Sequence, residues 1–180
     1  MLLVVDNGSI YTKQLTDFLG KKGILFEKKV SQSLDLNSLV NYNSFILSGR
    51  RKNEKKINEI NSKIITYCIK NNIKLLGICY GAEILALTLG GTIRKNTFVQ
   101  KGNELIKISR ENLICSDSLN VFESHAFEIS KLPSVLVPLA GSENCKYEII
   151  QHEKKLIFGT QFHPEMSRDG NDLIKKFCSL

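Results

Sequence analysis

Short apolar runs alternate with segments of helical periodicity along the first half of the chain. The run Leu2–Asp6 is short and continuous, as expected for a strand that is buried on both faces. The segment Glu54–Asn71 instead places apolar side chains three and four residues apart, which predicts an amphipathic helix. Similar apolar runs fall at 24–30, 44–49 and 74–78, and similar helical patterns at 11–19 and 81–89. This alternation predicts a mainly parallel sheet with helices on both faces.

The second half of the chain is richer in strands. A last helix is predicted near Asp169–Ser179, and it follows five short apolar runs at 105–109, 120–124, 135–140, 146–151 and 156–162. Closely spaced runs of this kind favour an antiparallel portion at one side of the parallel sheet. The chain has no internal repeat, low-complexity segment or linker, and its length suffices for one sizeable core. We therefore expect a single domain, residues 1–180, with a flavodoxin-like three-layer α/β fold.

The formal net charge of +7 raises the question of an acidic partner. The lysines are spread along the whole chain, and the densest basic cluster, Gly49–Lys56, contains no aromatic residue. A nucleic-acid interface usually combines a basic patch with aromatic side chains. The charge is therefore better explained as a solvated surface than as a nucleic-acid site. A basic loop that docks on an acidic protein or touches a phosphate stays a second interpretation of Gly49–Lys56.

Cysteine usage and hydropathy bear on the cellular compartment. The five cysteines are an odd number at scattered spacings, without a CxxC pair, so the pattern indicates neither a zinc site nor a disulfide framework. No apolar run is long enough to span a membrane, and the first residues do not resemble a signal peptide. We expect a reduced, cytoplasmic protein with no membrane segment.

Cys79 lies where a predicted buried strand becomes a helix, in the stretch LLGICYGAEIL at 75–85. Functional groups gather at the carboxyl ends of strands in sheets of this class. Gly77 and Gly81 permit a sharp turn, and a residue at such an elbow is held strained with its side chain exposed. The helix N-terminus would favour the thiolate, and its N–H groups could stabilise an oxyanion. The alternative is a small cysteine buried in a packed turn.

A cysteine nucleophile needs a base, and the base needs an orienting group. His163 and Glu165 follow an apolar run in the stretch FGTQFHPEMS. Pro164 holds the backbone extended, so both side chains can lie on one side of the chain. Glu165 can then accept a hydrogen bond from one ring nitrogen while the other nitrogen faces Cys79. Taken singly, the histidine could be an ordinary strand-end residue and the glutamate a solvated acid.

The combination of GICYGAE with QFHPE resembles the class I glutamine amidotransferases. The stretches LVVDNGSIYT and FILSG fall where that family has corresponding strands, so the resemblance covers nearly the whole chain. It implies that Cys79 attacks the side-chain amide of L-glutamine, that His163 is the base and that Glu165 orients it. Ammonia is released, and water hydrolyses the resulting thioester. It also implies a nucleophile elbow and no cofactor bound by this chain.

Three stretches are most similar to the separate glutaminase subunit of archaeal-type GMP synthases: VVDNGSIYT, ESHAFEISKLP and SENCKYEIIQHEKKLIFGTQFHPE. This similarity implies that ammonia passes to a separate ATP-pyrophosphatase synthetase subunit, which converts XMP to GMP and binds ATP and magnesium itself. The chain lacks both a GxxxxGK[ST] phosphate loop and a pyrophosphatase loop, so a partner is required for the ligase step.

The resemblance also implies further site residues. The backbone N–H groups of Arg50 and Tyr80 would form the oxyanion hole. The substrate-binding positions would be Gly49, Glu83, Ser124, His125 and Ala126. Of these, His125 would face the partner.

Two of these positions and the neighbouring Phe127 depart from the family pattern. Family members usually have glycine in place of Arg50, glutamine in place of Glu83 and an acid in place of Phe127. Arginine resists backbone conformations that glycine permits, so we expect an oxyanion hole that is preformed differently or is formed only with a partner.

Other functions remain open from the sequence alone. The chain could serve another synthetase, such as anthranilate synthase, as its glutaminase component. The three departures, at Arg50, Glu83 and Phe127, would also suit a catalytically weakened binding or regulatory protein with the same fold. A different hydrolase with a cysteine elbow is the third alternative, and the QFHPE stretch argues against it.

Overall fold

The computed structural model describes all residues, 1–180. One nine-stranded sheet has the strand order β2-β1-β3-β4-β9-β8-β7-β5-β6. The strands are β1 (Leu2–Asn7), β2 (Phe26–Val30), β3 (Ser44–Arg50), β4 (Lys74–Ile78), β5 (Thr92–Ile108), β6 (Ser118–Lys131), β7 (Leu136–Gly141), β8 (Ile149–His152) and β9 (Ile157–Thr160). The α-helices are α1 (Thr12–Lys21), α2 (Lys55–Asn71), α3 (Tyr80–Thr88) and α4 (Arg168–Ser179). Three short 3-10 helices are η1 (Ser31–Ser33), η2 (Leu36–Asn41) and η3 (Pro164–Met166).

The sheet has a parallel half and an antiparallel half. Strand β1 pairs in parallel with β2 and β3, β3 with β4, and β4 with β9. This order is that of flavodoxin-like doubly wound sheets, so the predicted fold class is confirmed. The remaining pairs, β9 with β8, β8 with β7, β7 with β5 and β5 with β6, are antiparallel. The predicted antiparallel portion therefore exists and makes up a large part of the sheet.

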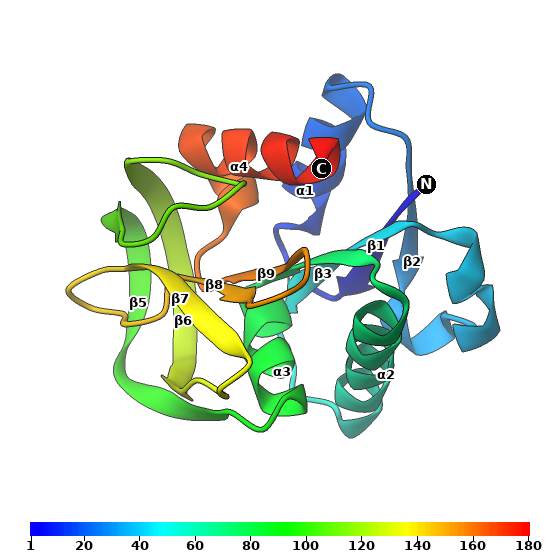
Figure 1. Ribbon diagram of the computed structural model, residues 1–180, viewed down its shortest axis with the longest axis horizontal. Helices are drawn as coiled ribbons and strands as arrows, with labels where there is room; N and C mark the ends of the chain where they lie inside the picture. The colour runs from blue at the N-terminus through cyan, green and yellow to red at the C-terminus, as the bar shows by residue number, and fades with distance from the viewer.

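Two apolar cores lie on the two faces of this sheet. Along β1, Leu3 and Val5 pack with residues of α2 and α3, whereas Leu2 and Val4 pack with residues of α1 and α4. The alternation follows from the two-residue period of a strand, which sends successive side chains to opposite faces. Figure 1 shows the resulting layers, with α1 and α4 above the sheet and α2 and α3 below it. The apolar run of each parallel strand is continuous because both of its faces are covered.

The hairpin of β5 and β6 is much longer than the sequence indicates. The apolar runs predict strands only at 105–109 and 120–124, whereas β5 has 17 residues and β6 has 14. The added residues are mostly polar and exposed, so they carry no hydrophobic period. The pairing passes from Lys95 with Phe127 to Gln100 with His125, which leaves residues 96–99 as a bulge on β5. This bulge lies next to the predicted site residue His125.

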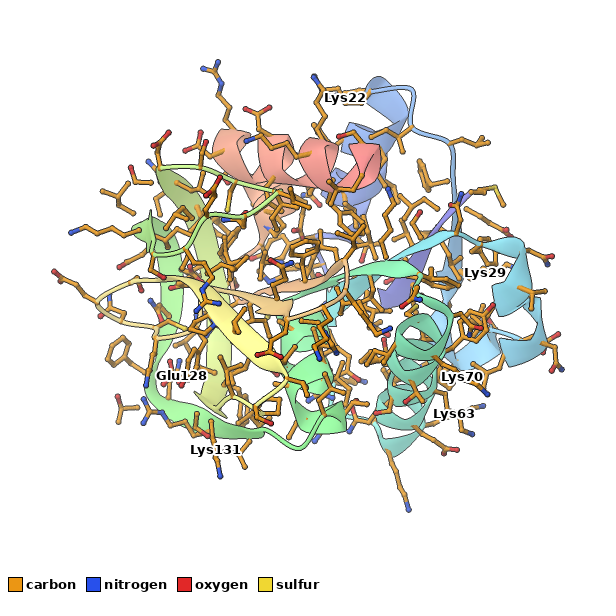
Figure 2. The ribbon with its side chains drawn as sticks, in the orientation of Figure 1. Lys22, Lys29, Lys63, Lys70, Glu128 and Lys131 are labelled. Carbon is orange, nitrogen blue, oxygen red and sulfur yellow. The ribbon has the colours of Figure 1, made fainter.

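The surface charge is distributed over the molecule. Figure 2 shows Lys22, Lys63 and Lys131 at three separate edges, each pointing away from the body of the protein. A solvated surface with dispersed lysines gives this arrangement, whereas a nucleic-acid site would concentrate them on one face. None of the helices has the length and apolar character that a membrane span requires.

Candidate active site

Cys79 occupies the turn between β4 and α3 in a backbone conformation that is rare for a residue with a side chain. Its φ is 52° and its ψ is −105°. The turn is held by hydrogen bonds on both sides: the N–H of Cys79 donates to the carbonyl of Thr160 at 2.7 Å, and its own carbonyl accepts from the N–H of Ala82 at 2.9 Å. A strained residue kept in place by its surroundings is typical of a functional site. The predicted nucleophile elbow is therefore present, but the expectation of an exposed side chain is wrong, because Cys79 is buried in the packed turn.

Two glycines allow this turn to pack. A Cβ atom on Gly77 would lie 2.4 Å from the carbonyl carbon of Gly81, and a Cβ atom on Gly81 would lie 2.5 Å from the carbonyl oxygen of Leu47. Both distances are too short for any side chain. Helix α3 can therefore start directly against β3 and β4 only because both positions are glycine.

The Cys79 thiol is buried among acidic groups. Burial, followed by the charge of Glu83, raises the pKa of the thiol well above its ordinary value, and the carboxylates of Glu165 and Glu123 act in the same direction. The N–H of Tyr80 at the start of α3 opposes the shift, but it is outweighed. The helix N-terminus thus favours the thiolate, as expected, but desolvation and the three carboxylates have the larger effect and favour the thiol.

His163 and Glu165 are paired as the sequence pattern predicts. Oε1 of Glu165 lies 2.9 Å from Nδ1 of His163, and both side chains are buried. The N–H of His163 donates to the carbonyl of Phe122 at 2.9 Å, which attaches the segment after β9 to β6. Because β4 and β9 are parallel neighbours, Cys79 and His163 follow their carboxyl ends at the same edge of the sheet. A carboxylate on Nδ1 leaves Nε2 free to act as an acceptor.

Tyr11, which the sequence analysis did not single out, packs against this histidine. The ring centroids of Tyr11 and His163 are 4.5 Å apart in an edge-on arrangement. The hydroxyl of Tyr11 donates to Oγ of Ser124 at 3.1 Å, so one side chain joins a predicted substrate-binding residue to the predicted base. Tyr11 lies in the NGSIYT stretch just before α1, where loop residues at the carboxyl end of a strand could have suggested a role.

Gly49 and Arg50 end strand β3 beside the same histidine. A Cβ atom on Gly49 would lie 3.0 Å from Cε1 of His163, so the base packs directly on this backbone. Arg50 does not belong to the residues with positive φ, so its backbone does not need the freedom of glycine. Its guanidinium lies over the ring of Tyr80 and donates to Oδ1 of Asn58 at 2.6 Å. Arg50, part of the basic cluster Gly49–Lys56, is therefore held at the end of β3 by partners within the protein.

The rest of that loop borders a cavity with charges of both signs. Arg51 and Lys52 line it together with Asp6 and Glu54, and its volume is about 560 Å³. Acidic groups beside the arginine and lysine weaken the second interpretation, in which this loop touches a phosphate.

Glu83 and His125 complete the buried interior of the site. Oε1 of Glu83 accepts from Nε2 of Gln161 at 3.3 Å, and burial raises the pKa of this carboxyl although Gln161, Arg50 and the two site histidines oppose it. For His125, burial alone would lower the pKa, but the Glu123 carboxylate and the Phe127 carbonyl outweigh burial and raise it. Ala126, half-buried, follows His125 on β6.

Glu123 and Glu148 are further buried acids that the sequence analysis missed. A signal exists for Glu123: Leu119, Val121, Glu123 and His125 recur every second residue and all are buried, so the glutamate falls at an inward-facing position. Glu148 gives no such signal, because it precedes β8 within a run of buried residues. No cluster of histidine, cysteine and acidic side chains has the arrangement of a metal site.

Comparison with known proteins agrees with this geometry. The family model for class-I glutamine amidotransferases matches residues 3–179. A subunit of the glutamine-hydrolyzing GMP synthase of Methanocaldococcus jannaschii is 30% identical over 195 residues, which cover 100% of this chain and 97% of that protein. The corresponding subunit from Pyrococcus abyssi is 31% identical over 188 residues, covering 100% and 98%. A crystal structure from Thermoplasma acidophilum, provisionally described as a subunit of GMP synthase, has a TM-score of 0.88 at 27% identity and covers 99% of this chain and 92% of its own. The chain therefore belongs to the class-I glutamine amidotransferase family.

Proposed function

We propose that this chain hydrolyses L-glutamine to glutamate and ammonia, and that it delivers the ammonia to a separate ATP-dependent synthetase that converts XMP to GMP. The observation that carries the hydrolytic step is the pairing of Glu165 with Nδ1 of His163 beside a strained, buried Cys79. The observation that carries the acceptor is the end-to-end similarity to proteins named as single subunits of glutamine-hydrolyzing GMP synthases.

In the proposed reaction the sulfur of Cys79 attacks the amide carbon of glutamine. The thiol proton passes to Nε2 of His163 and then to the departing nitrogen, so the C–N bond breaks and ammonia leaves. Water attacks the thioester carbon and the C–S bond breaks. Glutamate is formed, and the Cys79 thiol is regenerated. Glu165 stabilises the imidazolium that forms on His163 in each step.

The acidic surroundings of Cys79 give His163 a particular task. Because burial and nearby carboxylates raise the pKa of Cys79, the resting thiol keeps its proton and must lose it during attack. The backbone N–H groups of Tyr80 and Arg50 would stabilise the oxyanion that develops on the substrate. A partner that rearranges the Arg50 loop or neutralises an acid would speed the reaction. We therefore expect the chain alone to be a slow glutaminase.

The partner in this proposal is an ATP-pyrophosphatase subunit that holds ATP and magnesium. An exposed apolar patch next to His125 supports a docking face there: Phe98 and Val99 on the β5 bulge are each 64% exposed, and Phe127 is 42% exposed. Large apolar side chains that gather beside a site and face solvent are typical of protein interfaces. A cytoplasmic location is part of the proposal, and it is supported by five free cysteines.

The proposed function is tested first by labelling with a glutamine-mimicking electrophile, followed by intact-mass analysis. We expect one adduct on Cys79 that excess glutamine blocks and that Cys79→Ser abolishes. Release of ammonia from glutamine is then measured with and without the synthetase subunit encoded in the same genome. We expect a rise of at least about tenfold in the complex, since activation that forms an oxyanion hole is worth 10²–10³-fold or so.

Two results would overturn this proposal. If Cys79 stays unlabelled with the synthetase present while other thiols react with a general reagent, the pocket does not bind glutamine. The chain would then be a binding protein that has kept the fold. If the chain alone turns over glutamine as fast as the complex does, the coupling to a synthetase is wrong.

A further inference from the structure

His125 is enclosed so that both of its ring nitrogens face acceptors. Nδ1 lies 2.8 Å from the carbonyl oxygen of Phe127 and 3.5 Å from the amide nitrogen of Asn96. Nε2 lies 3.1 Å from Oε2 of Glu123 in an ion-pair contact without hydrogen-bond geometry. The ring is 4% exposed, so water cannot replace either partner. A neutral imidazole has only one N–H and would leave one of these acceptors facing a lone pair. The geometry therefore favours the imidazolium form, with a proton on each nitrogen.

Glu148 is a second buried acid, and it differs from Glu123 in its partners. Oε1 of Glu148 accepts from the hydroxyl of Ser142 at 2.8 Å, and Oε2 has no partner. Neither carboxyl oxygen of Glu123 has a hydrogen-bond partner of good geometry. Glu123 is also the charged group that acts most strongly on Glu148. Burial and the charge of Glu123 therefore both favour the protonated form of Glu148.

The assignment of that proton follows from the surroundings. Glu123 faces the positive ring of His125, whereas Glu148 faces Glu123 and a neutral hydroxyl, so the proton belongs on Glu148. The other titratable groups around the cluster are Glu83 on α3, Glu104 on β5, Glu128 on β6 and Cys145 before β8. Arg94 is paired with Glu128, at 2.6 Å between Nε and Oε1, and does not neutralise the cluster.

We propose that Glu148 and Glu123 are positioning residues that share one proton and hold His125 as an imidazolium, which fixes the backbone of residues 124–127 beside the active site. The bond from His125 to the Phe127 carbonyl spans this short segment. Ser124, at its start, accepts from Tyr11, which packs on His163. The acidic cluster thereby sets the shape of the predicted substrate-binding segment without touching substrate. Only the kinetic consequence of this inference rests on the proposed glutaminase function.

The test uses the fact that the chain has three histidines, which can be followed separately by NMR of the labelled ring atoms. In the wild-type chain, the ¹⁵N spectrum should show protons on both nitrogens of His125 at neutral pH. His125 should also titrate at a higher pH than His152, whose pKa burial lowers. A neutral His125 at pH 7, or one that titrates below His152, overturns the proposal without any variant.

Variants then separate the two acids. Glu123→Gln should lower the pH at which His125 titrates, since burial is then opposed only by the Phe127 carbonyl and the charge of Glu83. Glu148→Gln mimics the protonated acid and should leave His125 unchanged, whereas Glu148→Ala should lower its titration. The matched control is Glu128→Gln, a buried glutamate on the same strand that faces Arg94 instead, and it should change nothing. If His125 titrates at the same pH in Glu123→Gln as in the wild type, the proposed role of Glu123 is wrong. If His125 titrates at the same pH in Glu148→Gln and Glu148→Ala, Glu148 has no part in holding His125.

The kinetic consequence is measured with the synthetase complex. Glu123→Gln should raise the KM for glutamine about tenfold while kcat changes less than about threefold, because the reacting groups stay in place and the binding segment loosens. A loss confined to kcat would contradict the positioning role. An inactive wild-type complex would count against the proposed function instead, and the NMR result would still stand.

Discussion

The guanidinium of Arg50 lies over the ring of Tyr80, with 3.9 Å between its central carbon and the ring centroid. The same group donates to Asn58 and Asn53, and the hydroxyl of Tyr80 donates to Asn58. The end of β3, the start of α2 and the residue after Cys79 are thereby joined. The side chain of Arg50 thus packs against the first residue after the elbow cysteine.

Replacement of Arg50 by alanine should therefore loosen the elbow. The stacking and the two hydrogen bonds are lost together, so we expect the free energy of unfolding to fall by roughly 1–2 kcal/mol. Urea denaturation measures this change. The matched control is Arg51→Ala, which removes the exposed neighbouring arginine and should shift stability by less than about 0.5 kcal/mol. Equal effects of the two variants would mean that the stacking contributes nothing.

Glu165→Gln should reduce glutamine hydrolysis by a factor on the order of 10² to 10⁴. The amide keeps the size of the side chain but cannot stabilise an imidazolium on His163, and it can impose the wrong tautomer. The measurement is ammonia release by the complex with the synthetase. The exposed Glu153→Gln variant serves as the control. A drop of less than about tenfold would remove Glu165 from the reaction.

The parts of the site that could be predicted from the sequence are those set by neighbours along the chain. Cys79 with its two glycines and His163 with Glu165 lie in short stretches, and the hydrophobic period places both stretches at strand ends. Tyr11, Glu123 and Glu148 come from three distant segments, and only folding brings them to the site.

Two further differences have physical causes of the same kind. Of the residues 92–104 that lengthen β5, only Gln100 is buried, so this length leaves no mark in the apolar pattern. The pKa of Cys79 rises first because its sulfur is buried and next because Glu83, Glu165 and Glu123 lie around it, and together these effects outweigh the local effect of the helix N-terminus. Local motifs thus predict which groups react, and tertiary packing sets their charge state.

Alkylation of Cys79 in the isolated chain should be slow at neutral pH and should speed up about tenfold for each pH unit. The reason is that the reactive thiolate is a minor form whose share grows with pH while the pH stays below the raised pKa. Peptide mapping by mass spectrometry follows Cys79 and Cys178 in the same sample. Cys178, whose pKa burial raises to about 11, provides the internal comparison. A Cys79 rate that is flat between pH 6 and 8 would indicate a preformed thiolate.

Gly77→Ala should destabilise the protein by roughly 3 kcal/mol or prevent folding, because the new Cβ would lie 2.4 Å from the backbone of Gly81. The matched control is Gly20→Ala. Gly20 lies in α1 with no atom within 4 Å of a new Cβ, so alanine there should stabilise the helix by about 0.5–1 kcal/mol. Thermal unfolding of the two variants tests both signs. Similar melting temperatures would mean that the elbow tolerates a side chain and that the close packing of α3 on β4 is not required.

Glu148 should make the stability of the protein fall as pH rises. Burial, and next the charge of Glu123, raise its pKa from 4.5 to about 9. Between these values the folded protein keeps a proton that the unfolded chain has released. This contribution to stability is complete below the unfolded pKa and is lost as pH rises toward the folded one, by about 1.4 kcal/mol per pH unit.

Glu148→Gln cannot titrate and should lose this slope, so its advantage in free energy of unfolding over the wild type should grow between pH 6 and 8. Urea denaturation at several pH values measures the difference, with Glu128→Gln as the control. Parallel curves for the wild type and Glu148→Gln would show that Glu148 is already ionised in the folded protein.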